Sequence, residues 1–183
     1  MNKLYIFLAD GFEEIEGLTV VDILRRAGVI VTTVSIMGRK TIVGSHSIVL
    51  EADELFEECD FSDGDMFVLP GGMPGTLHLG KHTALTELLK KADQEEKGIA
   101  AICAAPSILG DLGLLKGREA VCYPGFEERL TGAFTSEAPV VTDGHITTSR
   151  GMGTAIPFAL ELTARMCGRE KADELAKGII YNA

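Results

Sequence analysis

Residues 98–109 read GIAAICAAPSIL, and this stretch decides the fold of the chain. Residues 99–102 are apolar and uncharged, which is typical of a parallel strand covered on both faces. Small residues follow Cys103, and Pro106 suits the first turn of a helix, where a missing N–H costs nothing. The stretch therefore predicts a buried strand that stops at Cys103 and turns at once into a helix.

Cys103 is the candidate reactive group of this junction. A thiol that faces the N-terminus of a helix meets the positive end of the helix dipole, which favours the thiolate. The arrangement is the thiol version of a nucleophile elbow, in which a sharp strand-to-helix turn exposes the reactive atom. We therefore expect Cys103 to be the one cysteine with a markedly lowered pKa. The alternative is a buried structural cysteine, which is a common fate for a free thiol.

We expect no metal site, either at the cysteines or at the acidic residues near the N-terminus. Acidic neighbours should raise the pKa of Cys59, and Cys122 and Cys167 should fill the core. The sequence contains no C-x-x-C pair and no Cys/His spacing of a zinc site. Glu13 and Glu16 lie at helical spacing, but no histidine is near them in sequence, and acids in a first helical turn are explained by the helix dipole.

Composition predicts one folded domain. The chain has 183 residues, of which 46% are hydrophobic and 24% charged, which suits a single α/β domain and argues against disorder. A net charge of −10 would repel a nucleic acid, and no stripe of basic residues compensates for it. Residues 151–156, GMGTAI, lack the third small residue of a dinucleotide fingerprint, so we expect no cofactor.

Neither a signal peptide nor a membrane helix is expected. The apolar run over residues 4–9 is short and soon meets acidic residues, unlike a signal peptide. No uncharged apolar run approaches the ~18 residues that a membrane helix needs. We expect a soluble cytoplasmic protein with reduced thiols and no membrane or nucleic-acid partner.

Predicted strands and helices alternate along the chain. The predicted strands are residues 3–8, 29–36, 65–69, 98–102, 119–122, 139–142 and 145–149, with a small hairpin over residues 41–50. The predicted helices are residues 14–27, 83–96, 154–167 and 170–180, besides the one that follows Cys103. Such alternation with short connections favours a mostly parallel sheet sandwiched between helices. We predict a single doubly wound, flavodoxin-like domain over residues 1–183.

The first predicted helix carries an apolar stripe. Its members are Ile15, Leu18, Val21 and Leu24, and Gly28 suits the end of the helix. We expect this stripe to face the core.

Three segments follow predicted strands and should meet at one edge of the sheet. They are residues 10–16, residues 71–75 and Cys103. Ligands of such sheets bind beyond the carboxyl ends of the strands. Gly71 and Gly72 would let backbone N–H groups approach a ligand closely, as an oxyanion hole requires, although a plain Pro-Gly-Gly turn is the alternative.

These segments, in this order, resemble the DJ-1/ThiJ/PfpI superfamily. The matching stretches are LADGFEEIE at residues 8–16, Asp22 with residues 25–28, VLPGG at residues 68–72, AICAAP at residues 101–106 and TSRGMGT at residues 148–154. The likeness spans essentially the whole chain. It looks closest to the DJ-1/ThiJ branch, whose members pair one reactive cysteine with a glutamate of the first helix.

The resemblance implies roles for particular residues. Cys103 would be the nucleophile, and a protonated Glu16 would hydrogen-bond its sulfur, which fits a carboxylic acid that is kept neutral by burial. The N–H groups of Gly72 and Ala104 would form an anion-binding pocket. The resemblance also implies a homodimer with the first helix at the interface and the site nearby.

Candidate pocket residues are Tyr123, His46 and Arg26, and two departures from the family pattern matter. Tyr123 stands where relatives active on aldehydes often carry histidine, and a phenol is a poor base at neutral pH. Ala104 stands where the protease-like branch carries histidine, so a peptidase or amidase would lack its base. His46 stands where some relatives carry arginine, and it is a candidate for reaching the site of a partner subunit.

Two classes of function remain open from the sequence. The first is a cofactor-free glyoxalase or deglycase that acts on reactive carbonyls such as methylglyoxal or their adducts, with Cys103 attacking the aldehyde. The second is a non-enzymatic redox sensor that protects against oxidative stress and in which Cys103 oxidises to a sulfinic acid. The same thiolate serves both. The presence of Tyr123 in place of the histidine of relatives active on aldehydes favours the redox sensor. The carbonyl chemistry for which the family is best known favours the enzyme.

Overall fold

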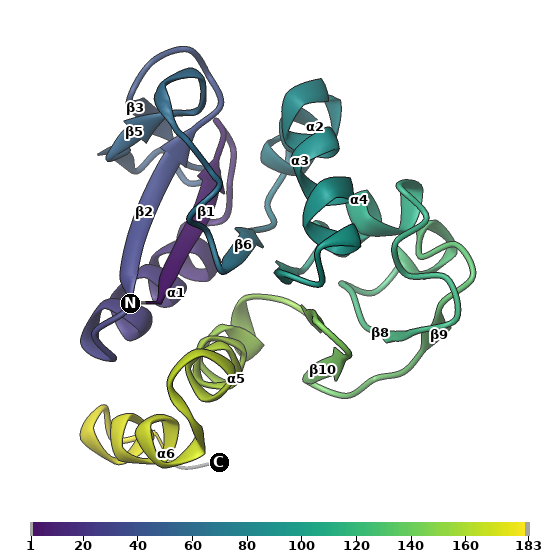
Figure 1. Cartoon of the computed structure of the whole chain (residues 1–183). Helices are drawn as coiled ribbons and strands as arrows, with labels where there is room; N and C mark the ends of the chain where they lie inside the picture. The colour runs from purple at the N-terminus through teal and green to yellow at the C-terminus, as the bar shows by residue number, and fades with distance from the viewer. Residues whose placement is uncertain (1, 182–183) are drawn as a thin grey trace.

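A seven-stranded sheet forms the centre of the computed structural model, which describes residues 2–181 (Figure 1). All neighbouring strands of this sheet are parallel except the first pair. In spatial order, the strands are β10 (Val140–Asp143), β11 (Ile146–Ser149), β7 (Gly98–Ile102), β6 (Met66–Leu69), β1 (Lys3–Leu8), β2 (Ile30–Ser35) and β5 (Glu54–Leu55). The predicted fold class is confirmed.

The sheet is buried on both faces because its strands are apolar on both sides. Residues 99–102 of β7 are fully buried, as their uncharged sequence predicts. Along β1, alternate side chains enter two different core clusters, with Leu4, Ile6 and Leu8 in one and Tyr5 and Phe7 in the other.

Helices cover each face. On the side of Leu4 and Ile6 lie α1 (Glu14–Arg26) and α5 (Ala155–Cys167), and α6 (Arg169–Gly178) packs on α5. On the other side lie α2 (Gly75–Lys81), α3 (Thr83–Gln94) and α4 (Pro106–Asp111). Figure 1 shows these two groups of helices apart from each other.

The predicted apolar stripe of α1 is only partly buried. Val21 and Leu24 enter the core, but Ile15 and Leu18 are 52% and 39% exposed. The buried side of α1 instead includes the two acidic residues of its first turn, Glu14 and Glu16. The expectation that the whole stripe faces the core is therefore wrong.

Several short elements differ from the predicted ones. The strand predicted over residues 119–122 is β8 (Glu119–Ala120), and it lies outside the central sheet, paired with β9 (Phe134–Thr135). The predicted hairpin is confirmed as β3 (Thr41–Val43) and β4 (Val49–Glu51). The strands β5 and β9 and the helix α2 were not predicted, and short 3-10 turns occur at η1 (Phe56–Glu58), η2 (Glu127–Arg129) and η3 (Met152–Thr154). Within residues 2–181, no helix combines the length and apolar character needed to cross a bilayer.

The strand order positions the site. The strands β2, β1, β6, β7 and β11 are adjacent in that order, which is the 2-1-3-4-5 order of flavodoxin-like sheets. From β1 the next strand, β2, is added on one side, and β6 and β7 are added on the other side. Ligands of such folds bind at this switch point, between β1 and β6. The segments after β1, β6 and β7 meet at this point.

Candidate functional site

Cys103 lies directly after β7 and has a backbone conformation that residues other than glycine rarely adopt. Its φ is 65°, in the left-handed region, and α4 begins three residues later at Pro106. Two backbone hydrogen bonds hold the turn: the Cys103 N–H donates to the Ser149 carbonyl at 2.9 Å, and the Tyr123 N–H donates to the Cys103 carbonyl at 2.8 Å. The predicted elbow is confirmed, and its strain of about 1–3 kcal/mol is held by β11 and by the segment around Tyr123.

Glu16 reaches the same point from the first turn of α1. Its side chain is 1% exposed, and its Oε2 accepts a hydrogen bond from the Gly71 N–H at 2.9 Å. A Cβ at Gly71 would lie 2.6 Å from the Cys103 Cβ and 2.6 Å from the same Glu16 oxygen. Only glycine therefore lets the loop after β6 pass between the carboxyl and the cysteine.

Three of the predicted site residues, Glu16, Gly72 and Ala104, contact the sulfur of Cys103. Its thiol hydrogen-bonds the Glu16 carboxyl, and the backbone N–H groups of Ala104 and Gly72 donate to the sulfur. Gly72 has a φ of 91°, and a Cβ there would meet the backbone of Glu13 at 2.3 Å, so a glycine is needed to aim this N–H. The structure thus brings Cys103, Glu16, Gly72 and Ala104 together.

Burial sets the pKa values of this pair. Burial raises the pKa of Glu16 to about 7, although the hydrogen bonds from Cys103 and Gly71 act in the opposite direction. Burial, followed by the negative charge of Glu16, raises the pKa of the Cys103 thiol to about 12. The N–H groups of Ala104 and Gly72 lower it by less. The lowered pKa predicted for Cys103 is therefore wrong, because burial and a facing carboxylate outweigh the end of a six-residue helix.

The other cysteines do not share this environment. Burial raises the pKa of Cys122 to about 11, and burial followed by the charge of Glu54 raises that of Cys59. The raised pKa of Cys59 was predicted, although Glu58 is only a smaller contributor. Cys122 is buried as predicted, whereas Cys167 is exposed at the end of α5, so its predicted place in the core is wrong.

Tyr123 borders the site without reaching the sulfur through a hydrogen bond. Its side chain is half exposed, and its ring lies against Gly151, where a Cβ would be 3.3 Å from Tyr123 Cδ2 and 4.0 Å from Glu16 Oε1. Gly151 therefore keeps the space between the phenol and the carboxyl open. Tyr123, a candidate pocket residue from the sequence, therefore lies beside the site with half of its side chain exposed.

His46 and Arg26 do not join Cys103 within this chain. The His46 ring contacts the carboxylates of Glu13 and Glu14. Arg26 lies ten residues beyond Glu16 along α1, about 15 Å away by the rise of a helix, and pairs with Asp22. Arg26 lines a shallow hollow beside Ile156, so its assignment to the pocket is wrong for the single chain.

The histidines offer no base to the thiol among the described residues. Besides His46, His82 caps α3 and His145 pairs with Asp93, while His78 lies on α2 beside Asp10. The groups that act on the Cys103 thiol are Glu16, Ala104 and Gly72. A cysteine peptidase or amidase would need a histidine here.

Two supporting residues of the site escaped the sequence analysis. The Ser149 carbonyl anchors the elbow, and Gly151 leaves room between Tyr123 and Glu16. Both lie about fifty residues from Cys103 in sequence. The run at residues 148–154, which resembles the family pattern, was the available signal, but its position in the sequence does not show which strand end it meets.

Comparisons with known proteins show which proteins and structures this chain resembles. Residues 2–165 match the model of the DJ-1/PfpI family. The chain is 38% identical to Protein DJ-1 homolog B of Arabidopsis thaliana over 181 residues, which are 98% of this chain and 41% of that protein. It is 34% identical to a deglycase of Pyrococcus abyssi over 154 residues, covering 82% of this chain and 91% of that one. Among solved structures, oxidized DJ-1 of Toxoplasma gondii superposes with a TM-score of 0.96 at 35% identity, covering all of both chains.

Proposed function

Because the chain belongs to the DJ-1/PfpI family, we propose that it is a cysteine-dependent protein that acts on reactive carbonyls by glyoxalase- or deglycase-like chemistry without a cofactor. One observation carries the proposal: the Cys103 sulfur contacts the Glu16 carboxyl and two backbone N–H donors, those of Gly72 and Ala104. A named deglycase among the relatives supports the same class of substrate. We expect the protein to act in the cytoplasm, where reducing conditions keep the thiol free.

The raised pKa of Glu16 suits this carboxyl to accept the thiol proton and then to donate it to the substrate oxygen. As ionised Glu16 takes the thiol proton, the sulfur attacks the aldehyde carbon, the S–C bond forms and the carbonyl π electrons move to oxygen. The N–H groups of Gly72 and Ala104, which act on the sulfur in the free protein, would stabilise this oxyanion, and Glu16 would return the proton to give a hemithioacetal.

Methylglyoxal is the simplest substrate for such a site. In its hemithioacetal, moving a hydrogen from the former aldehyde carbon to the neighbouring carbonyl carbon gives a lactoyl thioester. Water then cleaves the thioester into lactate and free Cys103. Adducts of the aldehyde with amines would enter the same route after they release the amine.

Turnover of methylglyoxal to lactate by chelator-treated protein tests the proposal. Cys103→Ser should abolish lactate formation, and Cys59→Ser, which removes a thiol outside the site, should leave it unchanged. The value of kcat/KM should rise with pH through about 7 as Glu16 ionises, and Glu16→Gln should lose this inflection along with most of the rate. Equal rates for wild type and Cys103→Ser would refute the enzyme.

Oxidation of Cys103 is a second candidate function, and the similarity to an oxidized DJ-1 structure favours it. In this function, peroxide oxidises the thiol to a sulfinic acid, and the N–H groups of Gly72 and Ala104 together with the Glu16 carboxyl stabilise the added oxygens. Mild peroxide followed by peptide mass analysis should show two added oxygens on the Cys103 peptide. A disulfide between Cys103 and Cys122, or oxidation confined to methionines, would contradict it.

A further inference from the structure

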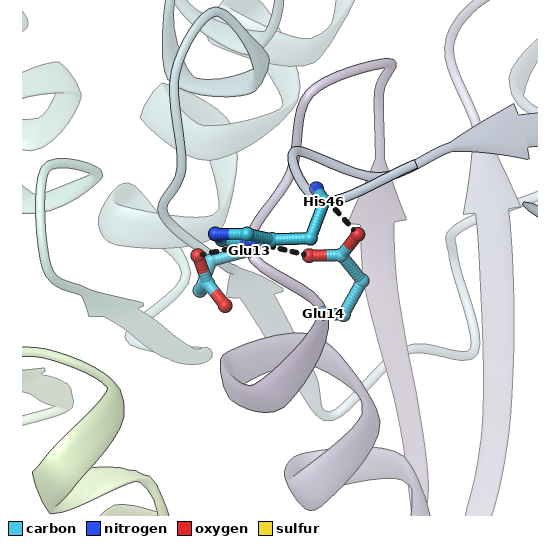
Figure 2. A group of neighbouring side chains, drawn as sticks. All are labelled: Glu13, Glu14 and His46. Carbon is cyan, nitrogen blue, oxygen red and sulfur yellow. Dashed lines mark hydrogen bonds and ion pairs between the residues drawn. The ribbon is translucent and has the colours of Figure 1, made fainter. Parts of the chain in front are cut away.

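Four polar side chains gather where the β3–β4 hairpin meets the start of α1. Glu13 and Glu14 come from the helix start, and Ser45 and His46 come from the hairpin turn. Figure 2 shows the His46 ring lying across both carboxylates. None of these groups takes part in the reaction proposed for Cys103.

The donor atoms of this cluster lie at the spacing of metal ligands. The His46 Nδ1 is 3.1 Å from Glu14 Oε2 and 3.5 Å from Glu13 Oε2. The Ser45 Oγ is 2.9 Å from that nitrogen and 3.1–3.2 Å from the same two oxygens. Ligands about 2.0–2.2 Å from a tetrahedral zinc ion are about 3.3–3.6 Å apart, so a modest expansion of the cluster would admit an ion.

The cluster is built around a buried carboxylate and opens to solvent. Glu14 is 4% exposed, and a Cβ at Gly44 would lie 2.2 Å from its Oε1, so the hairpin needs a glycine to fit over the carboxylate. The backbone N–H of His46 holds that same oxygen at 2.8 Å, which leaves Oε2 facing the ring nitrogen. The His46 side chain is 69% exposed, so an ion could enter from the solvent beside it.

We propose that Glu13, Glu14 and His46 bind a zinc ion. Two carboxylates with a neutral imidazole carry a charge of −2, which one Zn²⁺ balances, and on binding the ion displaces any proton held by His46 Nδ1. Mixed nitrogen and oxygen ligands in a tetrahedral arrangement suit zinc, whereas Ca²⁺ takes six to eight oxygens and Mg²⁺ an octahedral set. The Ser45 hydroxyl or a water molecule fills the fourth position.

Zinc titration of metal-stripped, full-length protein by calorimetry tests the site. Wild type should bind one zinc ion per chain. Loss of a supporting residue around a metal typically costs about 10–100-fold in affinity, so removal of a ligand in His46→Gln or Glu13→Gln should cost more than about 100-fold. His78→Gln removes a histidine outside the cluster and should leave the affinity unchanged.

Two further measurements separate this site from the reactive thiol and from unfolding. Cys103→Ser should bind zinc as wild type does, and the Co²⁺ form should show visible d–d bands without a thiolate charge-transfer band. Circular dichroism should show that His46→Gln is folded. Absence of zinc binding by wild type, unchanged affinity in folded His46→Gln, or loss of binding in Cys103→Ser would overturn the proposal.

Discussion

Buried Glu16 and half-buried Cys103 are two ionisable groups in direct contact, and the contact affects them in opposite ways: the hydrogen bond from the thiol lowers the pKa of Glu16, whereas the Glu16 carboxyl raises the pKa of Cys103. Burial is the largest cause of the raised pKa at both residues, and the negative charge of Glu16 adds to it at Cys103. The thiol therefore depends on a base rather than on the helix dipole for its activation. Glu16, with a pKa of about 7, is the group in contact with it that can accept the proton near neutral pH.

Glu16→Gln should stabilise the protein more at pH 8 than at pH 5. The pKa of Glu16 is about 7 in the folded chain against an ordinary value of 4.5, so the folded state holds this proton more tightly than the unfolded state does. Its contribution to the free energy of unfolding is fully present below pH 4.5 and is lost as pH rises through 7. The loss amounts to about 2–3 kcal/mol between pH 5 and pH 8, and a neutral glutamine avoids it.

Urea unfolding of wild type and Glu16→Gln at the two pH values measures this difference. Glu87→Gln, on the exposed side of α3, should change the unfolding free energy little at either pH. A stability gain of Glu16→Gln that is the same at pH 5 and pH 8 would contradict the raised pKa.

Gly71→Ala, in the loop after β6, should disrupt the contact between Glu16 and Cys103. The added methyl would lie 2.6 Å from both the Cys103 Cβ and Glu16 Oε2, and 2.9 Å from the Ile102 carbonyl. Overpacking of this kind typically costs about 1–3 kcal/mol, and here it should also push Glu16 away from the sulfur. Urea unfolding and the rate of Cys103 alkylation measure the two effects.

Gly153→Ala is the matched control for this change, because a Cβ at Gly153 has no heavy atom within 4 Å. It should alter neither the stability nor the alkylation rate by a comparable amount. If Gly71→Ala behaved like Gly153→Ala, the close passage of the loop between Glu16 and Cys103 would be wrong.

At the scale of elements, the helices α2 and α3 are joined by the single residue His82. It ends α2, and its Nδ1 accepts a hydrogen bond from the Leu85 N–H at 3.1 Å, which caps α3. Its ring also packs on Phe56, with ring centroids 4.6 Å apart. One residue thus orients two helices on the face of the sheet opposite α1.

His82→Ala should destabilise the protein by at least about 1 kcal/mol, since it removes an N-terminal cap as well as the contact with Phe56. His82→Asn restores a capping acceptor and should recover the part of the loss due to the cap. Urea unfolding of the two variants compares them. Equal stability of His82→Ala and His82→Asn would show that the cap contributes nothing.

At the scale of the whole molecule, an exposed apolar surface points to self-association. It comprises Ile15 and Leu18 of α1, Met152 of η3 and Ile156 of α5, all at least 38% exposed. Apolar side chains gathered on neighbouring elements are typical of interfaces. We expect a homodimer that buries this surface, with α1 at the interface as the family resemblance implies.

Sedimentation at micromolar concentration tests the dimer. Wild type should sediment as twice the chain mass of 19.6 kDa, and Leu18→Glu should shift it to the single chain, because dimerisation would bury the new charge. Phe134→Glu, which changes an exposed apolar residue of β9 outside this surface, should leave the dimer intact. Wild type at the mass of one chain would contradict the expectation.

The sequence by itself determined the order of the main strands and helices and the elbow at Cys103. These features follow from local patterns: an uncharged run predicts the buried strand β7, and a proline three residues past Cys103 predicts the start of α4. The meeting of the segments after β1, β6 and β7 was also predictable, because the carboxyl ends of parallel strands lie at one edge. The short strands β5 and β9 could not be predicted, since two residues carry no periodicity.

Only the tertiary structure decided what surrounds each side chain. It buried Glu14 and Glu16 while leaving Ile15 exposed, although Ile15 belongs to the apolar stripe that the sequence of α1 shows. It raised the pKa of Cys103 by enclosing the thiol against Glu16. It also brought His46 to Glu13 and Glu14, which lie 33 and 32 residues earlier in the sequence, and this removes the reason for expecting no metal site. Burial, and the charges that a fold brings together from distant segments, depend on long-range packing, which local patterns do not encode.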